Sequence, residues 1–258
     1  MIETRSTQVA RATSAATHTA RTAGPDEQAT QRALTRLGSV AALVGAALLF
    51  GSTLLHPLGS DPSDAAAAFA EYALDSLWLW SHIGQFAGIA ALVVALVALA
   101  STLDPGPSAA WSRIGLAGAA ATLAVAAVLQ AVDGVALKLM VDRWAASTGA
   151  ARVLAYEGAF AVRQVEIGLA SFLSLVSGLT LTAFGLAMLL SRRYPGWLGA
   201  LGLLGGLGTV VAGAAQASTG FSGLAMTLSM LASTALLLWA ILTGVFLWRS
   251  APRLAHDG

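Results

Sequence analysis

The chain has 258 residues, of which 57% are hydrophobic and only 10% are charged. An ordinary soluble domain carries about 25% charged residues, so this chain lacks the charges to cover a water-facing surface. The absence of cysteine excludes disulfide scaffolds, thiolate metal sites and cysteine nucleophiles. The net charge of +1, with no basic stripe outside the first 36 residues, excludes a nucleic-acid-binding surface. These features together indicate an integral membrane protein.

Uncharged stretches of about 20 residues are the length that a helix needs to cross a ~30 Å hydrocarbon core. Five such stretches occur, and the last is long enough for two helices separated by the turn Thr219–Gly223. We therefore predict an all-α fold, a polytopic integral membrane protein built as a six-transmembrane-helix bundle. The expected spans are residues 37–56, 78–102, 112–133, 163–190, 196–217 and 223–248.

The basic residues predict the orientation of this bundle. Only four of the 14 basic residues fall on the side opposite the chain termini, namely Lys138, Arg143, Arg152 and Arg163. Lysine and arginine accumulate on the cytoplasmic side of membrane proteins, so both termini are expected to be cytoplasmic. Because arginine, alanine and glycine dominate, we expect a high-GC bacterial gene and a multi-pass protein of the bacterial plasma membrane.

The parts of the chain outside the spans divide into two tails and one long connection. Residues 1–32 lack apolar periodicity and are predicted to be a disordered cytoplasmic tail. Residues 33–250 form the six-helix transmembrane domain, and residues 251–258 form a second cytoplasmic tail. The longest outer connection, 133–161, is expected to contain a short interfacial helix.

Glycine predicts close helix packing in the fifth span. Gly199, Gly202 and Gly206 recur there at spacings of three and four residues, which lets the backbone of a second helix approach closely. Gly115 and Gly118 in the third span could face this surface. The interpretation is packing within one chain, and the alternative is a homodimer face.

Ionisable and amide side chains in the spans are costly, so each is a candidate functional group. In the predicted topology they lie in the outer half of the bundle, and several occur as pairs three residues apart. They predict a small polar pocket; the alternative is a set of residues that only solvates or pairs helix ends. The candidate ligand-binding residues are His82, Gln85, Gln130, Asp133, Glu157, Arg163, Gln164 and Glu166.

No catalytic residue can be assigned from these groups. Gly220–Gly223 matches the GxSG of intramembrane serine proteases, but no histidine lies nearby in the sequence to act as a base. We predict no metal and no cofactor; the alternative is a haem or metal ion held by His56 and His82, with Asp133 or Glu166. A carboxylic acid that initiates chemistry on an apolar substrate is a further alternative.

The leading functional prediction is an integral membrane protein that binds or senses a lipid or amphiphile in an outer-leaflet polar pocket. The alternatives are a membrane-embedded enzyme acting on a lipid or isoprenoid, and a scaffold or accessory membrane subunit. Expected partners are membrane lipids, a small amphiphilic ligand and a second copy of the chain, and no nucleic acid.

Two loop motifs resemble those of a known family. These are Asp61-Pro-Ser-Asp-Ala-Ala-Ala-Ala in the first outer loop, and Tyr194-Pro-Gly-Trp-Leu-Gly after Arg192-Arg193. Together with the approach 156–167 to the fourth span, they make residues 33–249 similar to the bacterial six-helix membrane proteins of domain-of-unknown-function family 4386. The resemblance implies the same topology and no catalytic residue.

Overall fold

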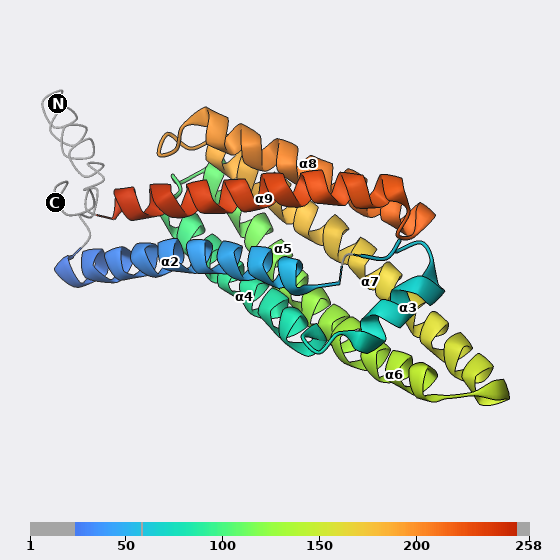
Figure 1. Ribbon diagram of the computed structural model, residues 1–258. Helices are drawn as coiled ribbons and strands as arrows, with labels where there is room; N and C mark the ends of the chain where they lie inside the picture. Colours follow the sequence, from blue (N-terminus) through green and yellow to red (C-terminus); the bar gives the residue numbers. More distant parts are fainter. Residues whose placement is uncertain (1–23, 58, 252–258) are drawn as a thin grey trace, which may run out of the picture.

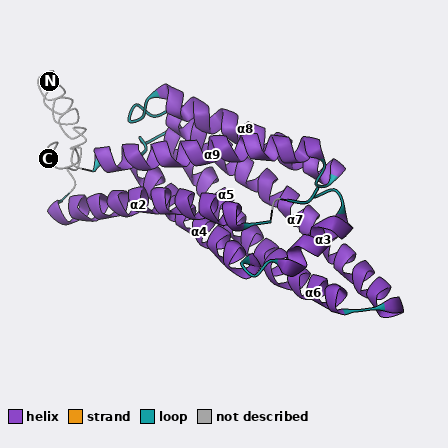
Figure 2. Cartoon of the chain, viewed as in Figure 1, coloured by secondary structure: helices purple, strands orange, loops and turns teal. Residues whose placement is uncertain are grey.

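The computed structural model describes residues 24–57 and 59–251. Within these ranges every regular element is helical (Figure 2). Six helices are long and apolar enough to cross a membrane, which confirms the all-α, six-helix membrane bundle. They are α2 (Pro25–Leu55), α4 (Trp78–Thr102), the continuous segment that starts with α5 (Pro107–Gln130), α7 (Gly149–Leu189), α8 (Gly196–Thr219) and α9 (Gly223–Ser250).

The six helices form a ring in chain order. Helix α4 packs between α2 and α5, α7 packs between α5 and α8, and α9 closes the ring by packing against both α8 and α2 (Figure 1). Consecutive helices of the ring run antiparallel. The first and last helices therefore lie side by side, and the centre of the ring is surrounded by all six.

Two of the helices are about twice as long as a membrane span. Helix α5 continues without a break into the π-helix η1 (Ala131–Leu137) and into α6 (Lys138–Ala146), giving 40 helical residues, and α7 has 41. At 1.5 Å per residue each is about 60 Å long, against a ~30 Å hydrocarbon core. The expected short helix in the connection 133–161 is therefore present as α6, but it continues the third span instead of lying apart from it.

A short helix, α3 (Ala65–Leu74), folds the connection between α2 and α4 against this long hairpin. The Asp64 carboxylate caps it by accepting hydrogen bonds from the backbone N–H groups of Ala66 and Ala67, which are otherwise unpaired at a helix start. Its buried Phe69 and Tyr72 pack against residues of α6 and α7. Helix α3 is thus packed into the fold.

Gly199, Gly202 and Gly206 of α8 pack against other helices of the same chain. A Cβ atom at Gly206 would lie 2.5 Å from the Thr182 backbone nitrogen on α7, and one at Gly199 would lie 2.8 Å from the Leu189 nitrogen on the same helix. Gly202 faces the Trp239 indole on α9. This packing accounts for the three glycines without a second chain. Gly115 and Gly118 also face α7, at Phe184 and Thr180, and not α8 as we had considered.

The helix boundaries differ from the expected ones mainly at the two ends of the sequence and at α7. Helix α2 begins at Pro25, so residues 25–32 of the expected tail are helical, whereas residues 1–23 lie outside the described part, as do 252–258 of the second tail. Helix α7 begins at Gly149, 14 positions before the expected start of its span at residue 163. The end of the bundle where α2 starts and α9 ends is called the terminal end. The opposite end, beside α3, is called the His–Asp end, after His56, His82 and Asp133, which lie there.

Candidate functional site

A cavity of about 260 Å³ lies in the centre of the ring. Each of the six spans contributes to its wall; examples, one from each helix, are Ala42, Ile89, Ala119, Leu173, Thr209 and Trp239. The wall is mostly apolar, and hydroxyl groups such as that of Thr209 donate to their own helix backbone. The cavity is therefore suited to an apolar molecule or to the apolar part of an amphiphile.

Two donors in the cavity wall have no partner. The indole nitrogen of Trp239 and the hydroxyl of Thr243 are buried and make no hydrogen bond within the described residues. They lie four residues apart on α9, and the indole nitrogen faces Gly202 of α8. Buried donors are costly to leave unpaired, which makes the Thr243 hydroxyl a candidate anchor for a ligand carbonyl or hydroxyl oxygen.

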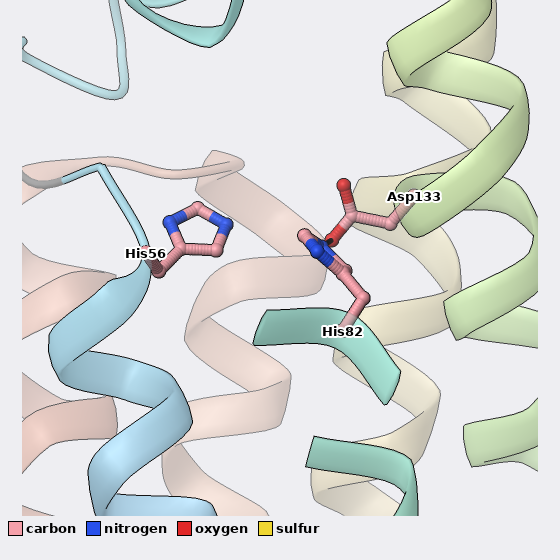
Figure 3. Close-up of side chains that lie close together, drawn as sticks. All are labelled: His56, His82 and Asp133. Carbon is pink, nitrogen blue, oxygen red and sulfur yellow. Dashed lines mark ion pairs between the residues drawn. The ribbon is translucent and has the colours of Figure 1, made fainter. Parts of the chain in front are cut away.

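At the His–Asp end, three ionisable side chains from different segments come together (Figure 3). His56 follows the last residue of α2, His82 lies one turn into α4, and Asp133 lies in η1. The His82 Nε2 and Asp133 Oδ2 atoms are 3.0 Å apart. One ligand atom from each of the three residues lies within 4.8 Å of the other two.

The π-helix brings Asp133 to this position. A π-helical turn is wider than an α-helical turn and is often found at functional sites. Its backbone is further held by the Trp78 indole, which donates to the Asp133 carbonyl at 3.2 Å. The next residue must be small, because a Cβ atom at Gly134 would lie 2.8 Å from the His82 Cβ.

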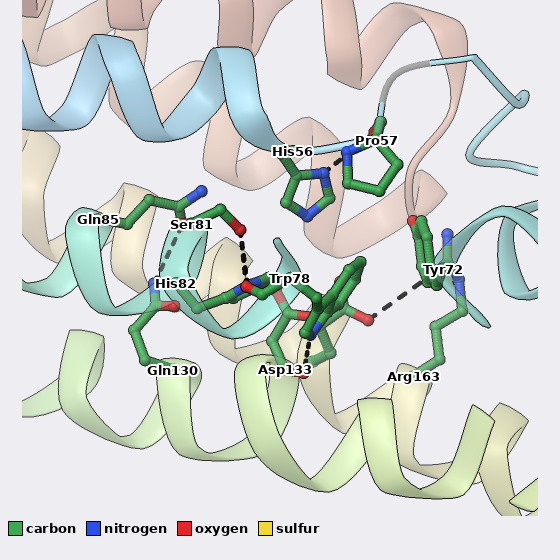
Figure 4. Close-up of polar contacts among 11 residues, drawn as sticks. His56, Pro57, Tyr72, Trp78, Ser81, His82, Gln85, Gln130, Asp133 and Arg163 are labelled. Atoms are coloured by element: carbon green, nitrogen blue, oxygen red, sulfur yellow. Dashed lines mark hydrogen bonds and ion pairs between the residues drawn. The ribbon is translucent and has the colours of Figure 1, made fainter. Parts of the chain in front are cut away.

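Backbone carbonyls orient both histidine rings (Figure 4). His82 Nδ1 lies 2.6 Å from the Trp78 oxygen, and His56 Nδ1 lies 3.1 Å from the Pro57 oxygen. A carbonyl oxygen can only accept, so we assign the hydrogen to Nδ1 in each ring. Nε2 is then the atom of each histidine that remains for a ligand.

A second buried polar group adjoins this cluster. Arg163, only 2% exposed, donates to the Pro62 carbonyl oxygen at 2.6 Å and to the Tyr72 hydroxyl at 3.3 Å (Figure 4). Its guanidinium is 4.0 Å from Glu166, whose Oε2 has no hydrogen-bond partner in the described ranges. Burial raises the pKa of Tyr72 above its usual range, so this hydroxyl stays protonated.

A groove of about 240 Å³ leads to His82 from the surface between α4 and the α5–η1 segment. Its walls include Leu79, Ile83 and Val135, large apolar side chains that are almost half exposed. His82 and Gln130 are its polar residues. In a membrane such walls face lipid, so the groove connects the acyl-chain region with the histidine.

Four of the eight predicted binding residues lie in these two polar groups: His82 contacts Asp133, and Arg163 lies beside Glu166. Gln130 lines the groove beside His82 and donates to the Gln85 side chain at 3.2 Å. Glu157 and Gln164 join neither group, because both are exposed on the surface of α7. Their spacing along α7 points them away from the face that carries Arg163 and Glu166.

The sequence interpretation missed several residues of the site. His56 was named only for a haem or metal, while Tyr72, Trp78 and Asp75 were not singled out. Asp75 acts electrostatically on both histidines, and its Oδ2 is buried without a partner within the described chain. A usable signal was that His56, Asp75 and Trp78 all flank the same predicted outer loop.

Comparisons with family models, with curated proteins and with solved structures found no match. The resemblance to family 4386 therefore stays a prediction. The class of the protein follows from its own fold, a six-helix multi-pass membrane bundle with a buried His–Asp cluster at one end.

Proposed function

We propose that this protein binds a lipid or another amphiphile, with the apolar part of the ligand in the central cavity and the polar part at the His–Asp end. The observation that carries the proposal is the cavity itself, which is enclosed by all six spans and has mostly apolar walls. Small-molecule sites typically have volumes of about 300–1,000 Å³ and a few polar groups on apolar walls. A cavity of about 260 Å³ is near the lower end of that range.

The distance between cavity and polar groups suits an amphiphile. Thr53, in the cavity wall, precedes His56 by three residues, or about 4.5 Å along the helix. Ser174, in the opposite wall, follows Glu166 by eight residues, or about 12 Å. A ligand with its chain between α2 and α7 would thus place a head group beside the buried charged residues.

The location that fits this function is the bacterial plasma membrane, with both termini in the cytoplasm. The distribution of basic residues supports this orientation. It would turn the His–Asp end, and the groove that leads to His82, toward the outer leaflet. The ligand would then enter from that leaflet.

Native mass spectrometry of the full-length protein in a mild detergent tests the proposal. We expect the wild type to retain a lipid or amphiphile mass and Ala119→Phe, which fills the cavity, to lose it. Ala120→Phe is the matched control, because Ala120 is exposed on the same helix. Thr243→Val changes shape very little and should weaken retention by removing an unpaired donor. A bare wild-type chain, or retention that Ala119→Phe leaves unchanged, would overturn the proposal.

The groove beside His82 favours one second candidate, a membrane-embedded enzyme acting on an apolar substrate. An acyl or isoprenoid chain lying along Leu79 and Ile83 would present its polar end to His82 and Asp133. Incubation with a bacterial lipid extract would then yield a product mass that the Asp133→Asn variant does not form. Identical lipid profiles for the two proteins would exclude this function for that extract.

A further inference from the structure

We propose that His56, His82 and Asp133 form a binding site for one divalent transition-metal ion of the zinc type. The proposal goes beyond lipid binding and does not depend on it. It assigns a chemical role to the His–Asp cluster, which lies at the end of the bundle and outside the wall of the central cavity.

The residue types and their separations fit such an ion. Two imidazoles and one carboxylate are a common protein ligand set for zinc, with a further position left for water or substrate. In a tetrahedral site with bonds of ~2.0–2.1 Å, ligand atoms lie about 3.3 Å apart. Here the three ligand atoms already lie within 4.8 Å of one another, and His82 Nε2 and Asp133 Oδ2 are 3.0 Å apart.

The surroundings of the histidines are those of metal ligands. A histidine that binds a metal through one ring nitrogen almost always donates the N–H of the other to a carboxylate, carbonyl or water. Both rings do this, His82 to the Trp78 oxygen and His56 to the Pro57 oxygen. The two Nε2 atoms are thereby kept as acceptors, the state that a cation needs.

Unpaired buried atoms are the second, independent observation. His82 Nε2 and Asp133 Oδ1 are both buried and have no hydrogen-bond partner in the described part of the chain. A cation between the two residues would satisfy both atoms. The π-helix supplies a reason for this geometry, because it turns Asp133 toward His82 at the cost of regular α-helical hydrogen bonding.

An ordinary His–Asp ion pair explains less. It would account for His82 and Asp133, but not for the His56 ring, whose centroid lies 5.3 Å from that of His82. Magnesium and calcium prefer oxygen ligands, whereas imidazole suits zinc, iron and copper. The Asp75 carboxylate, which acts on both rings, adds negative charge that favours a dication.

Metal titration of the chelator-treated, full-length protein in detergent tests the site. With Zn²⁺ as the probe we expect one high-affinity ion per chain, and a loss of affinity of at least about 100-fold in His56→Gln and in Asp133→Asn. Glu157→Gln is the control, because it removes an exposed carboxylate that lies outside the cluster. His18 and His256 are unchanged in every variant, so binding by them would persist in all. Competition with Fe²⁺ and Mn²⁺ would show which dication the site prefers.

A variant that gains a spectroscopic band distinguishes the loss of a metal ligand from misfolding. The chain contains no cysteine, so Asp133→Cys introduces the only thiol, at a reach similar to that of the carboxylate. With Co²⁺ as the probe, we expect a sulfur-to-cobalt charge-transfer band in this variant that is absent from the wild type. Unchanged Zn²⁺ affinity in His56→Gln and Asp133→Asn, or the absence of the band in a folded Asp133→Cys, would overturn the proposal.

Discussion

The two ends of the bundle differ in how far their polar side chains are satisfied by hydrogen bonds. At the terminal end the Asp104 carboxylate accepts hydrogen bonds from the Ser191 hydroxyl at 2.9 Å and from the Arg192 backbone at 2.7 Å. Nearby, the hydroxyls of Thr102 and Tyr194 are 2.6 Å apart. These groups are paired with one another and tie the α4–α5 connection to the α7–α8 connection.

At the His–Asp end, ionisable side chains lie close together, but several of their buried atoms make no hydrogen bond within the described residues. Asp75 Oδ2, His82 Nε2, Asp133 Oδ1 and Glu166 Oε2 all lack hydrogen-bond partners within the described chain. Folded proteins rarely keep such atoms without a reason, because each costs free energy on burial. The polar groups of the terminal end thus connect two loops of the bundle, whereas the unsatisfied atoms of the His–Asp end support the metal site that we propose there.

Among the variants, replacement of Arg163 at the His–Asp end should cause the largest loss of stability. Arg163→Met would leave Glu166 as a buried carboxylate without its cation, and removal of one partner of a buried ion pair typically costs about 3–5 kcal/mol. Thermal unfolding in detergent would measure the loss. The double variant Arg163→Met/Glu166→Gln should recover much of it; equal instability of the single and double variants would show that the pair is not coupled.

The contact between α7 and α8, which runs between the two ends, should be next most sensitive. A valine at Gly206 would force α8 away from α7, where the Cβ position is 2.7 Å from the Gly178 oxygen. Overpacking of this kind typically costs about 1–3 kcal/mol. Gly208→Val is the control, because no atom lies within 4 Å of that Cβ position. If both variants unfold at the same temperature, the close packing of α7 and α8 is not a source of stability.

Gly134→Ala should affect the His–Asp end alone. Its Cβ would lie 2.8 Å from the His82 Cβ, so α4 and η1 must move apart and carry His82 away from Asp133. We expect a loss of Zn²⁺ affinity with a change in stability of no more than about 1–2 kcal/mol. Gly168→Ala meets nothing within 4 Å and should keep the wild-type affinity. Wild-type affinity in Gly134→Ala would contradict the assignment.

The smallest effect is expected at the terminal end. Hydrogen bonds from the Arg192 backbone, and then from Ser191, lower the pKa of Asp104 from its usual 3.8. The folded state therefore binds this proton less readily than the unfolded state, so the stabilisation is present above about pH 4 and is lost as the pH falls through the folded-state pKa. Because the carboxylate is partly exposed, it contributes less than about 1 kcal/mol.

Thermal unfolding of Asp104→Ala at several pH values measures this contribution. At pH 6 the variant should unfold at most about 2–4 °C below the wild type, and the difference should shrink below pH 4. Glu157→Ala, at an exposed acid of α7, is the control and should show no such pH dependence. A difference that stays constant down to pH 3 would mean that the carboxylate charge does not matter.

The six spans could be derived from the sequence because membrane insertion depends on local properties. A run of about 20 apolar residues must be helical in lipid whatever surrounds it, so five uncharged stretches, the last divided by the turn Thr219–Gly223, located six helices. The glycines of α8 were recognised in the same way, since small residues permit close approach wherever they occur. Boundaries outside the membrane were less predictable. The continuous segment α5–η1–α6 and helix α7 extend beyond the apolar runs, where α6 and the start of α7 pack on each other and on α3.

The composition of the site was decided by tertiary structure. His56 and Asp133 are 77 positions apart in the sequence and meet only because the ring places α2, α4 and η1 at one end. The π-helix that turns Asp133 toward His82 leaves no clear mark in the sequence, since it depends on the Trp78 indole and on the space that Gly134 leaves free. Glu157 and Gln164 have the right chemistry and the right helix, but helical periodicity places them on the exposed face. The sequence determined which segments cross the membrane, and packing among the helices decided which polar side chains share one buried site.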